Sequence, residues 1–135
     1  MLVKNHTTVP LTEVTIGGAV GCRVRWLIEH GNAPTFAMRE FEIAPGGRAP
    51  KHYHQYEHEV FILSGQGVVI DGENKIERPI VAGDVVFIGP NEKHGFRNTG
   101  SEPLRFLCMI PNIATSSQII DVPDDEDELP AAKSA

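Results

Sequence analysis

The chain has few cysteines and no long apolar run, and each absence excludes a class of protein. Among its 135 residues, Cys22 and Cys108 are too few for a disulfide framework and have no C-x-x-C spacing, so both are interpreted as reduced, small hydrophobic residues. No apolar run approaches the roughly 18 residues of a membrane-spanning helix, and the N-terminus lacks the apolar stretch of a secretory signal. A cytoplasmic location is therefore expected.

Basic residues are also scarce, with 12 Lys and Arg against 18 Asp and Glu and a net charge of -6. Most of this charge lies in residues 121–135, whose six carboxylates and Lys133 give -5 and leave about -1 for the rest. Because there is no basic patch, nucleic acids and anionic membranes are not expected as partners. The expected partner is a small molecule. Motifs for serine hydrolysis, nucleotide triphosphates and dinucleotides are absent as well.

Glycine and proline divide the chain into short runs rich in Val, Ile, Phe and Thr, which is typical of an all-β sandwich or barrel. Asp71-Gly72 between two such runs predicts a β-hairpin. No segment has a capped helical period. Strands are predicted near residues 22–29, 35–43, 50–54, 58–63, 67–71, 74–81, 84–88, 94–98 and 104–110.

Three of the six histidines, His52, His54 and His58, lie within seven positions. If this stretch is extended, their even numbering puts them on one face, where they converge. Imidazole is a common metal ligand, so the pattern predicts a metal site, with His94 as the candidate for a fourth ligand. The alternative is that these imidazoles only form hydrogen bonds on a polar strand face.

Two sequence motifs around these histidines resemble those of a known protein family. Residues 46–67, with glycine, H-x-H and a glycine-ended strand, resemble the first cupin motif, and residues 83–98, from glycine through proline to histidine and asparagine, resemble the second. Over residues 20–112 the chain is most similar to small single-domain cupin 2 barrels of the manganese-binding, four-histidine type. The resemblance implies a double-stranded β-helix, the cupin jelly roll, and a homodimer.

This resemblance also divides the chain into three parts. Residues 1–20 are expected to be an N-terminal extension, residues 21–113 the cupin barrel, and residues 114–135 a C-terminal segment. The end of that last segment is acidic and rich in proline, so it is predicted to be disordered.

The chain departs from the cupin pattern at two positions. Where most cupins have a metal-binding Glu this chain has His58, flanked by Glu57 and Glu59. In a regular strand His58 shares the face of the other histidines and Glu59 points away, although a bulge before it would reverse that choice. Asn91 replaces the usual glycine of the turn before His94, and Asn tolerates the left-handed conformation that this turn needs.

The predicted metal ligands are His52, His54, His58 and His94, and their chemistry leaves the ion open. A tetrahedral zinc with four histidines would be closed and structural, whereas an octahedral ion would keep two positions for substrate or dioxygen. Imidazole suits Zn(II), Cu(II), Fe(II) or Ni(II). The resemblance favours Mn(II), with Fe(II) second.

Strand parity also predicts the residues that line a pocket beside the metal. Val60 and Ile62 share the face of His58. Phe106 and Cys108 alternate with Arg105, Leu107 and Met109, and in similar cupins the former set faces the barrel interior. Arg39 lies on the apolar face of its strand, where it either anchors an anionic substrate or forms a structural ion pair. The predicted pocket residues are Arg39, Val60, Ile62, Phe96, Phe106 and Cys108.

These features lead to three hypotheses for function. The first is a metal-dependent, oxygenase-like enzyme acting on a small organic molecule. The second is a binding or sensor module without turnover, and the third is a non-redox isomerase or decarboxylase in which the metal polarises a carbonyl. Cupins host many reactions, so the step from site to reaction rests on analogy.

Overall fold

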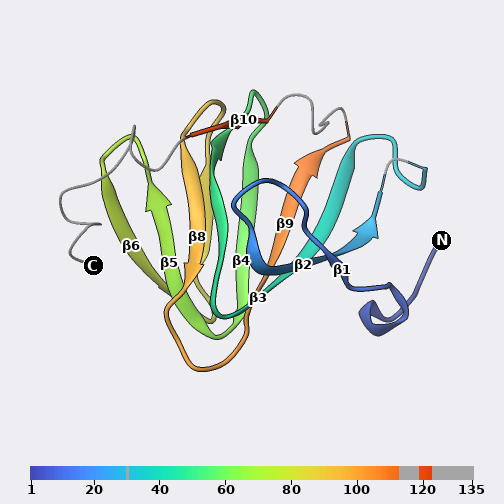
Figure 1. Ribbon diagram of the computed structural model, residues 1–135. Helices are drawn as coiled ribbons and strands as arrows, with labels where there is room; N and C mark the ends of the chain where they lie inside the picture. The colour runs from blue at the N-terminus through green and yellow to red at the C-terminus, as the bar shows by residue number, and fades with distance from the viewer. Residues whose placement is uncertain (30, 113–118, 123–135) are drawn as a thin grey trace.

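A computed structural model (Figure 1) describes residues 1–29, 31–112 and 119–122 of the chain. In chain order these residues form η1 (His6–Thr8), β1 (Thr12–Glu13), β2 (Val20–Ile28), β3 (Phe36–Tyr53), β4 (His58–Ser64), β5 (Gln66–Asp71), β6 (Ile76–Val81), β7 (Val85–Ile88), β8 (His94–Asn98), β9 (Leu104–Pro111) and β10 (Ile120–Asp121). No helix among them is long and apolar enough to cross a membrane. The predicted three-part division stays a prediction, and the predicted disorder of the acidic tail concerns residues 123–135, outside the described ranges.

The strands form one curled sheet with the order β6-β5-β8-β3-β9-β4-β7, and neighbours in this order are antiparallel. At the margins, β1 pairs with β2, while β2 and β10 both pair with β3. The sheet curls into the half-barrel seen in Figure 1. The predicted all-β fold, a double-stranded β-helix, is confirmed.

The inner face of the barrel follows from residue alternation. Along β9 the buried side chains are Leu104, Phe106, Cys108 and Ile110, and the residues between them are only partly buried. Strand β4 repeats the pattern, with buried and exposed residues alternating from His58 to Ile62. Because successive side chains point to opposite faces, each strand contributes one apolar row to a single interior.

Two predicted boundaries differ from the structure. Residues 35–43 and 50–54 were expected to be separate strands, but both belong to β3, which bends at Gly46, where φ is +77°. The bend lets β3 pair with β9 before it and with β8 after it. The predicted hairpin at Asp71 is present, although β6 begins at Ile76 because Lys75 has a φ of +58° in the turn.

One glycine is required by close packing between strands. A Cβ atom added to Gly67 in β5 would lie 2.4 Å from the carbonyl oxygen of Arg97 and 2.8 Å from the Leu104 side chain. Real Cβ atoms do not approach a backbone that closely, so a side chain here would push β5 away from β8.

Candidate metal centre

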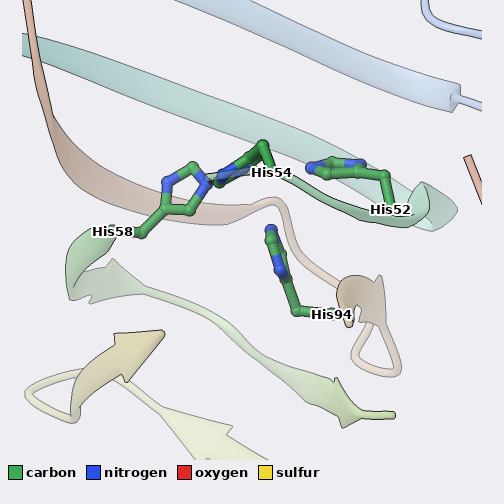
Figure 2. Close-up of side chains that lie close together, drawn as sticks. All are labelled: His52, His54, His58 and His94. Atoms are coloured by element: carbon green, nitrogen blue, oxygen red, sulfur yellow. Dashed lines mark hydrogen bonds between the residues drawn. The ribbon is translucent and has the colours of Figure 1, made fainter. Parts of the chain in front are cut away.

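The four histidines reach one point from three strands (Figure 2). His52 lies near the end of β3 and His54 just beyond it, whereas His58 opens β4 and His94 opens β8. The run from 52 to 58 is therefore not one extended strand, as the parity argument assumed, because the chain bends at residues 55–56. The pairing of β3 with β8 places His52 opposite His94 and brings the fourth imidazole to the other three.

The imidazoles are close enough to share one ion. Their candidate ligand atoms all lie within 4.8 Å of one another, and Nε2 of His54 is 2.6 Å from Nε2 of His58. Two ligands at about 2.1 Å from one ion are at most about 4.2 Å apart, so the widest pair needs to close by only about half an ångström. Nδ1 of His52 and Nε2 of His94 are buried without a partner. This donor set fits a divalent cation.

Backbone carbonyls orient two of the rings. Nδ1 of His54 donates to the carbonyl oxygen of Tyr56 at 2.6 Å, and Nδ1 of His94 donates to that of Glu92 at 2.8 Å. A carbonyl only accepts, so in both rings Nδ1 carries the proton and Nε2 keeps its lone pair for the cluster. The Tyr56 ring also stacks on His54 with 3.7 Å between centroids.

His58 has a different outer partner. Its Nδ1 lies 2.7 Å from Sγ of Cys108 and 3.2 Å from Nη2 of Arg39, which also donates to Sγ at 3.1 Å. The thiol and the guanidinium therefore hold this ring from behind. The sequence showed that Cys108 points inward, but not that its sulfur contacts a candidate ligand.

Burial keeps the histidines neutral, which is the form that binds metal. It lowers the pKa of His94 to about 3, with His52 adding to the effect, and lowers the pKa of His54 to about 4 against the opposing hydrogen bond to Tyr56. Burial and then the Arg39 charge hold the pKa of His58 well below 6.5. The pKa of His52 is also lowered, chiefly by burial.

The flanking carboxylates stay outside the cluster. Glu59 is exposed, and with Glu57 it borders a surface groove on the outer side of the sheet. Asn91 has a φ of +64°, the left-handed conformation expected of it, and its N–H donates to the carbonyl oxygen of His54 at 2.7 Å. The turn before His94 is thus hydrogen-bonded to the backbone of the first histidine motif at His54.

A cavity of about 60 Å³ adjoins the histidines. Of the predicted pocket residues, Arg39, Phe96, Phe106 and Cys108 line it, whereas Val60 and Ile62 are packed into the core with exposures of 1% and 0%. Eight further lining residues were not among those predicted. They are Val14, Ile16, Cys22, Phe41, Ala49, Pro50, Tyr56 and Ile119.

The short strand β10 covers this end of the barrel (Figure 1). It pairs Asp121 with His52 and Ile120 with Tyr53, and the N–H of Val122 donates to the carbonyl oxygen of Lys51 at 3.1 Å. Because Ile119 lines the cavity, this segment forms part of the wall of the candidate site.

Comparisons with known proteins agree with this geometry. The sequence profile of the cupin domain matches residues 39–110. The oxalate-binding protein of Thermotoga maritima is 39% identical over 82 residues, which are 60% of this chain and 64% of that protein. Auxin-binding protein 1 of Arabidopsis thaliana is 31% identical over an alignment of 121 positions that covers 81% of this chain and 58% of that protein. The chain thus spans less than two thirds of the length of either relative.

Among solved structures, the polyketide cyclase RemF from Streptomyces resistomycificus superposes with a TM-score of 0.86 at 28% identity, covering 99% of this chain and 97% of that one. A predicted oxalate decarboxylase from Thermotoga maritima gives a TM-score of 0.71 at 29% identity, covering 82% and 98%. The first superposition includes the segments on both sides of the region that the profile matches.

Proposed function

Because this chain belongs to the cupin family, as its two histidine motifs indicated, we propose that it is a metal-dependent enzyme acting on a small organic molecule. The ion would be held by His52, His54, His58 and His94. The observation that supports this most is the convergence of four largely buried imidazoles, two of them fixed by backbone carbonyls with Nε2 directed into the cluster.

A divalent ion held there would supply Lewis acidity or one-electron chemistry. Four neutral ligands leave its formal charge uncompensated and, in octahedral coordination, leave two positions for other molecules. Mn(II) is the first proposal for its identity and Fe(II) the second, with Zn(II), Ni(II) and Cu(II) as further possibilities.

The protein residues orient and enclose the reactants. Phe96 and Phe106 stack on each other at 4.6 Å and form an apolar wall that limits entry of water. No carboxylate is present among the described residues that line the cavity. Burial raises the pKa of the three other acidic groups there, Cys22, Tyr56 and Cys108, so none is a ready general base at neutral pH. This favours oxygenase-like chemistry over proton transfer.

A second candidate is a non-redox reaction in which the ion polarises a carbonyl, as in a cyclase, isomerase or decarboxylase. It is favoured by the likeness to the polyketide cyclase, which extends over nearly the whole of both chains. The third, a binding module without turnover, is favoured by the relative named as an oxalate-binding protein.

All three candidate functions assume that the four histidines bind a metal ion, and the metal content of the protein tests this. Protein purified without added metal should contain about one divalent ion per chain by elemental analysis, and His58→Ala should lose most of it. Glu59→Gln is the matched control, since this neighbour lies outside the cluster, and it should keep the ion. Full retention of the ion by His58→Ala, together with its loss in Glu59→Gln, would show that His58 is not the ligand and that Glu59 is.

Metal exchange separates the chemical alternatives. Oxygen uptake and product formation should be compared for the Fe(II)-, Mn(II)- and Zn(II)-loaded protein against small organic acids and ketones. Oxygen uptake with Fe(II) or Mn(II) but not Zn(II) supports the oxygenase-like proposal. Turnover without oxygen uptake in all three supports the non-redox candidate, and saturable binding without product supports the binding module.

We also propose a homodimer that forms through β7. Among the described strands β7 pairs only with β4, and its outer face exposes Val85 and Phe87 beside Phe61 of β4. An apolar edge strand left open invites pairing with another chain. Sedimentation velocity should show a dimer, and Phe87→Asp should yield monomers that keep their metal.

A further inference from the structure

Arg39 is the only charged side chain, apart from any protonated histidine, among the described residues that line the cavity. It lies near the start of β3, in register with Trp26 of β2 and Cys108 of β9. Its guanidinium carbon lies 4.8 Å from the centre of the Phe41 ring and 5.4 Å from that of the Trp26 ring. Aromatic faces therefore hold the cation, but the rings provide no oxygen or nitrogen acceptor for its N–H groups.

Those N–H groups have only neutral partners or none. Nη2 contacts Sγ of Cys108 at 3.1 Å and Nδ1 of His58 at 3.2 Å, while Nε is buried without a hydrogen-bond acceptor. An unsatisfied buried donor on a charged group is costly, so Nε is the position where an additional acceptor would stabilise the site most.

Other arginines of the described chain show what this one lacks. Each of the five in the following list has a carboxylate within 4 Å. The pairs are Arg23 with Glu42, Arg25 and Arg105 with Glu40, Arg78 with Asp71, and Arg97 with Glu77. Even Glu40, the residue next to Arg39, points to the opposite side of the sheet and pairs there. Among the residues that the structure describes, no carboxylate forms an ion pair with Arg39.

Charge balance then indicates the class of ligand, in an inference that rests on the proposed metal site. A divalent ion on four neutral imidazoles and an unpaired guanidinium leave the interior strongly positive. The guanidinium fork matches a carboxylate, whose two oxygen atoms accept in parallel. A negatively charged ligand would therefore balance the positive charge that the described residues leave uncompensated.

We propose that the site takes small organic carboxylates, whose oxygen atoms accept hydrogen bonds from Nε and Nη2 of Arg39 while the rest of the molecule extends toward the histidines. The cavity of about 60 Å³ is far smaller than the roughly 300–1,000 Å³ of an ordinary ligand pocket. The ligand is thus a molecule of few non-hydrogen atoms.

The Nε–H group of Arg39 provides a direct readout by ¹H–¹⁵N NMR, with its signal assigned from the spectrum of Arg39→Lys. Metal-stripped and Zn(II)-loaded protein should be titrated with acetate, pyruvate and oxalate, and in parallel with the uncharged acetamide and oxamide. At least one carboxylate should shift this signal saturably in the Zn(II)-loaded protein, and its amide should not. Affinity, followed in every variant from the backbone amide signals, should fall at least tenfold in Arg39→Lys and Arg39→Gln and stay unchanged in the surface control Arg23→Gln.

Three results would overturn the inference: no carboxylate shifts the Nε–H signal, chloride or sulfate binds as tightly as the carboxylates, or Arg39→Lys keeps the wild-type affinity. If both Arg39 variants misfold, as judged from their amide spectra, the wild-type titration alone decides. Metal content of the same samples separates this inference from the proposed function. If the protein never retains metal but still binds carboxylates through Arg39, the proposed function is refuted and the inference about Arg39 is not.

Discussion

We expect the metal-free protein to lose stability steeply as the pH falls from about 6.5 to 4. Burial lowers the pKa of folded His54 to about 4 and that of His94 to about 3, whereas both titrate near 6.5 in the unfolded chain. At pH 5 the unfolded chain therefore binds nearly two more protons than the folded one at these residues. The stability that depends on neutral imidazoles is present above pH 6.5 and is lost as the pH falls toward the folded-state pKa values.

The size of this effect follows from proton linkage. One proton corresponds to about 1.4 kcal/mol per pH unit, so His54 and His94 together give a slope of about 2 to 3 kcal/mol per unit near pH 5. Between pH 6.5 and 4 the total loss is about 6 kcal/mol, against the 5 to 15 kcal/mol that folds a typical domain. His52 and His58 shift in the same direction and steepen the dependence.

Guanidinium unfolding of metal-stripped protein at several pH values between 4.5 and 7 measures this slope, with the fluorescence of Trp26 as the probe. His94→Gln should lower the slope by about one proton, or about 1.4 kcal/mol per pH unit, whereas Arg23→Gln should leave it unchanged. A flat profile over this range, or the same slope in His94→Gln, would show that the folded histidines are not held neutral.

Three other substitutions test the contacts around the site and in the core. Cys108→Ala removes the thiol that contacts His58 and should weaken metal retention about 10- to 100-fold in a chelator competition. Cys108→Ser should retain more metal than Cys108→Ala. Equal retention by the wild type and both variants would contradict this role of Cys108. Ile62→Ala should lower the free energy of unfolding by about 2 to 5 kcal/mol because Ile62 is fully buried, and a loss below about 1 kcal/mol in urea unfolding would show that the core collapses around it. Gly67→Ala should destabilise severely while Gly17→Ala, whose Cβ meets nothing within 4 Å, should be nearly neutral in thermal unfolding; similar melting temperatures would refute the packing argument.

The sequence predicted the strands and the histidine positions because both depend on local patterns. The alternation along β9 and β4 fixes which residues face inward, and the two motifs fix the spacing of the histidines. The parity argument assumed one extended strand from His52 to His58 and still placed all three together. It did so because the bend at residues 55–56 redirects the chain without turning His58 out of the barrel.

The remaining features depend on contacts between distant segments, which local patterns do not encode. Glu40 points away from the interior, yet it is only 1% exposed. Arg105 and His6 hydrogen-bond its carboxylate from β9 and from the N-terminal 3-10 helix, and Arg25 lies 3.8 Å away. In the same way, Val14 and Ile119 line the cavity although one precedes β2 and the other follows β9 in the sequence.

The register that sets His52 opposite His94 also has a consequence for the order of folding. His52, His54 and His58 are neighbours in the sequence, so an unfolded chain already presents three imidazoles to an ion, whereas the fourth arrives only when β8 docks on β3. Ion binding to the unfolded trio reduces the stabilisation that the ion gives to the native state. The kinetics of metal uptake should therefore have a fast, weak phase from local capture and a slow, tight phase that reports the long-range closure of the barrel.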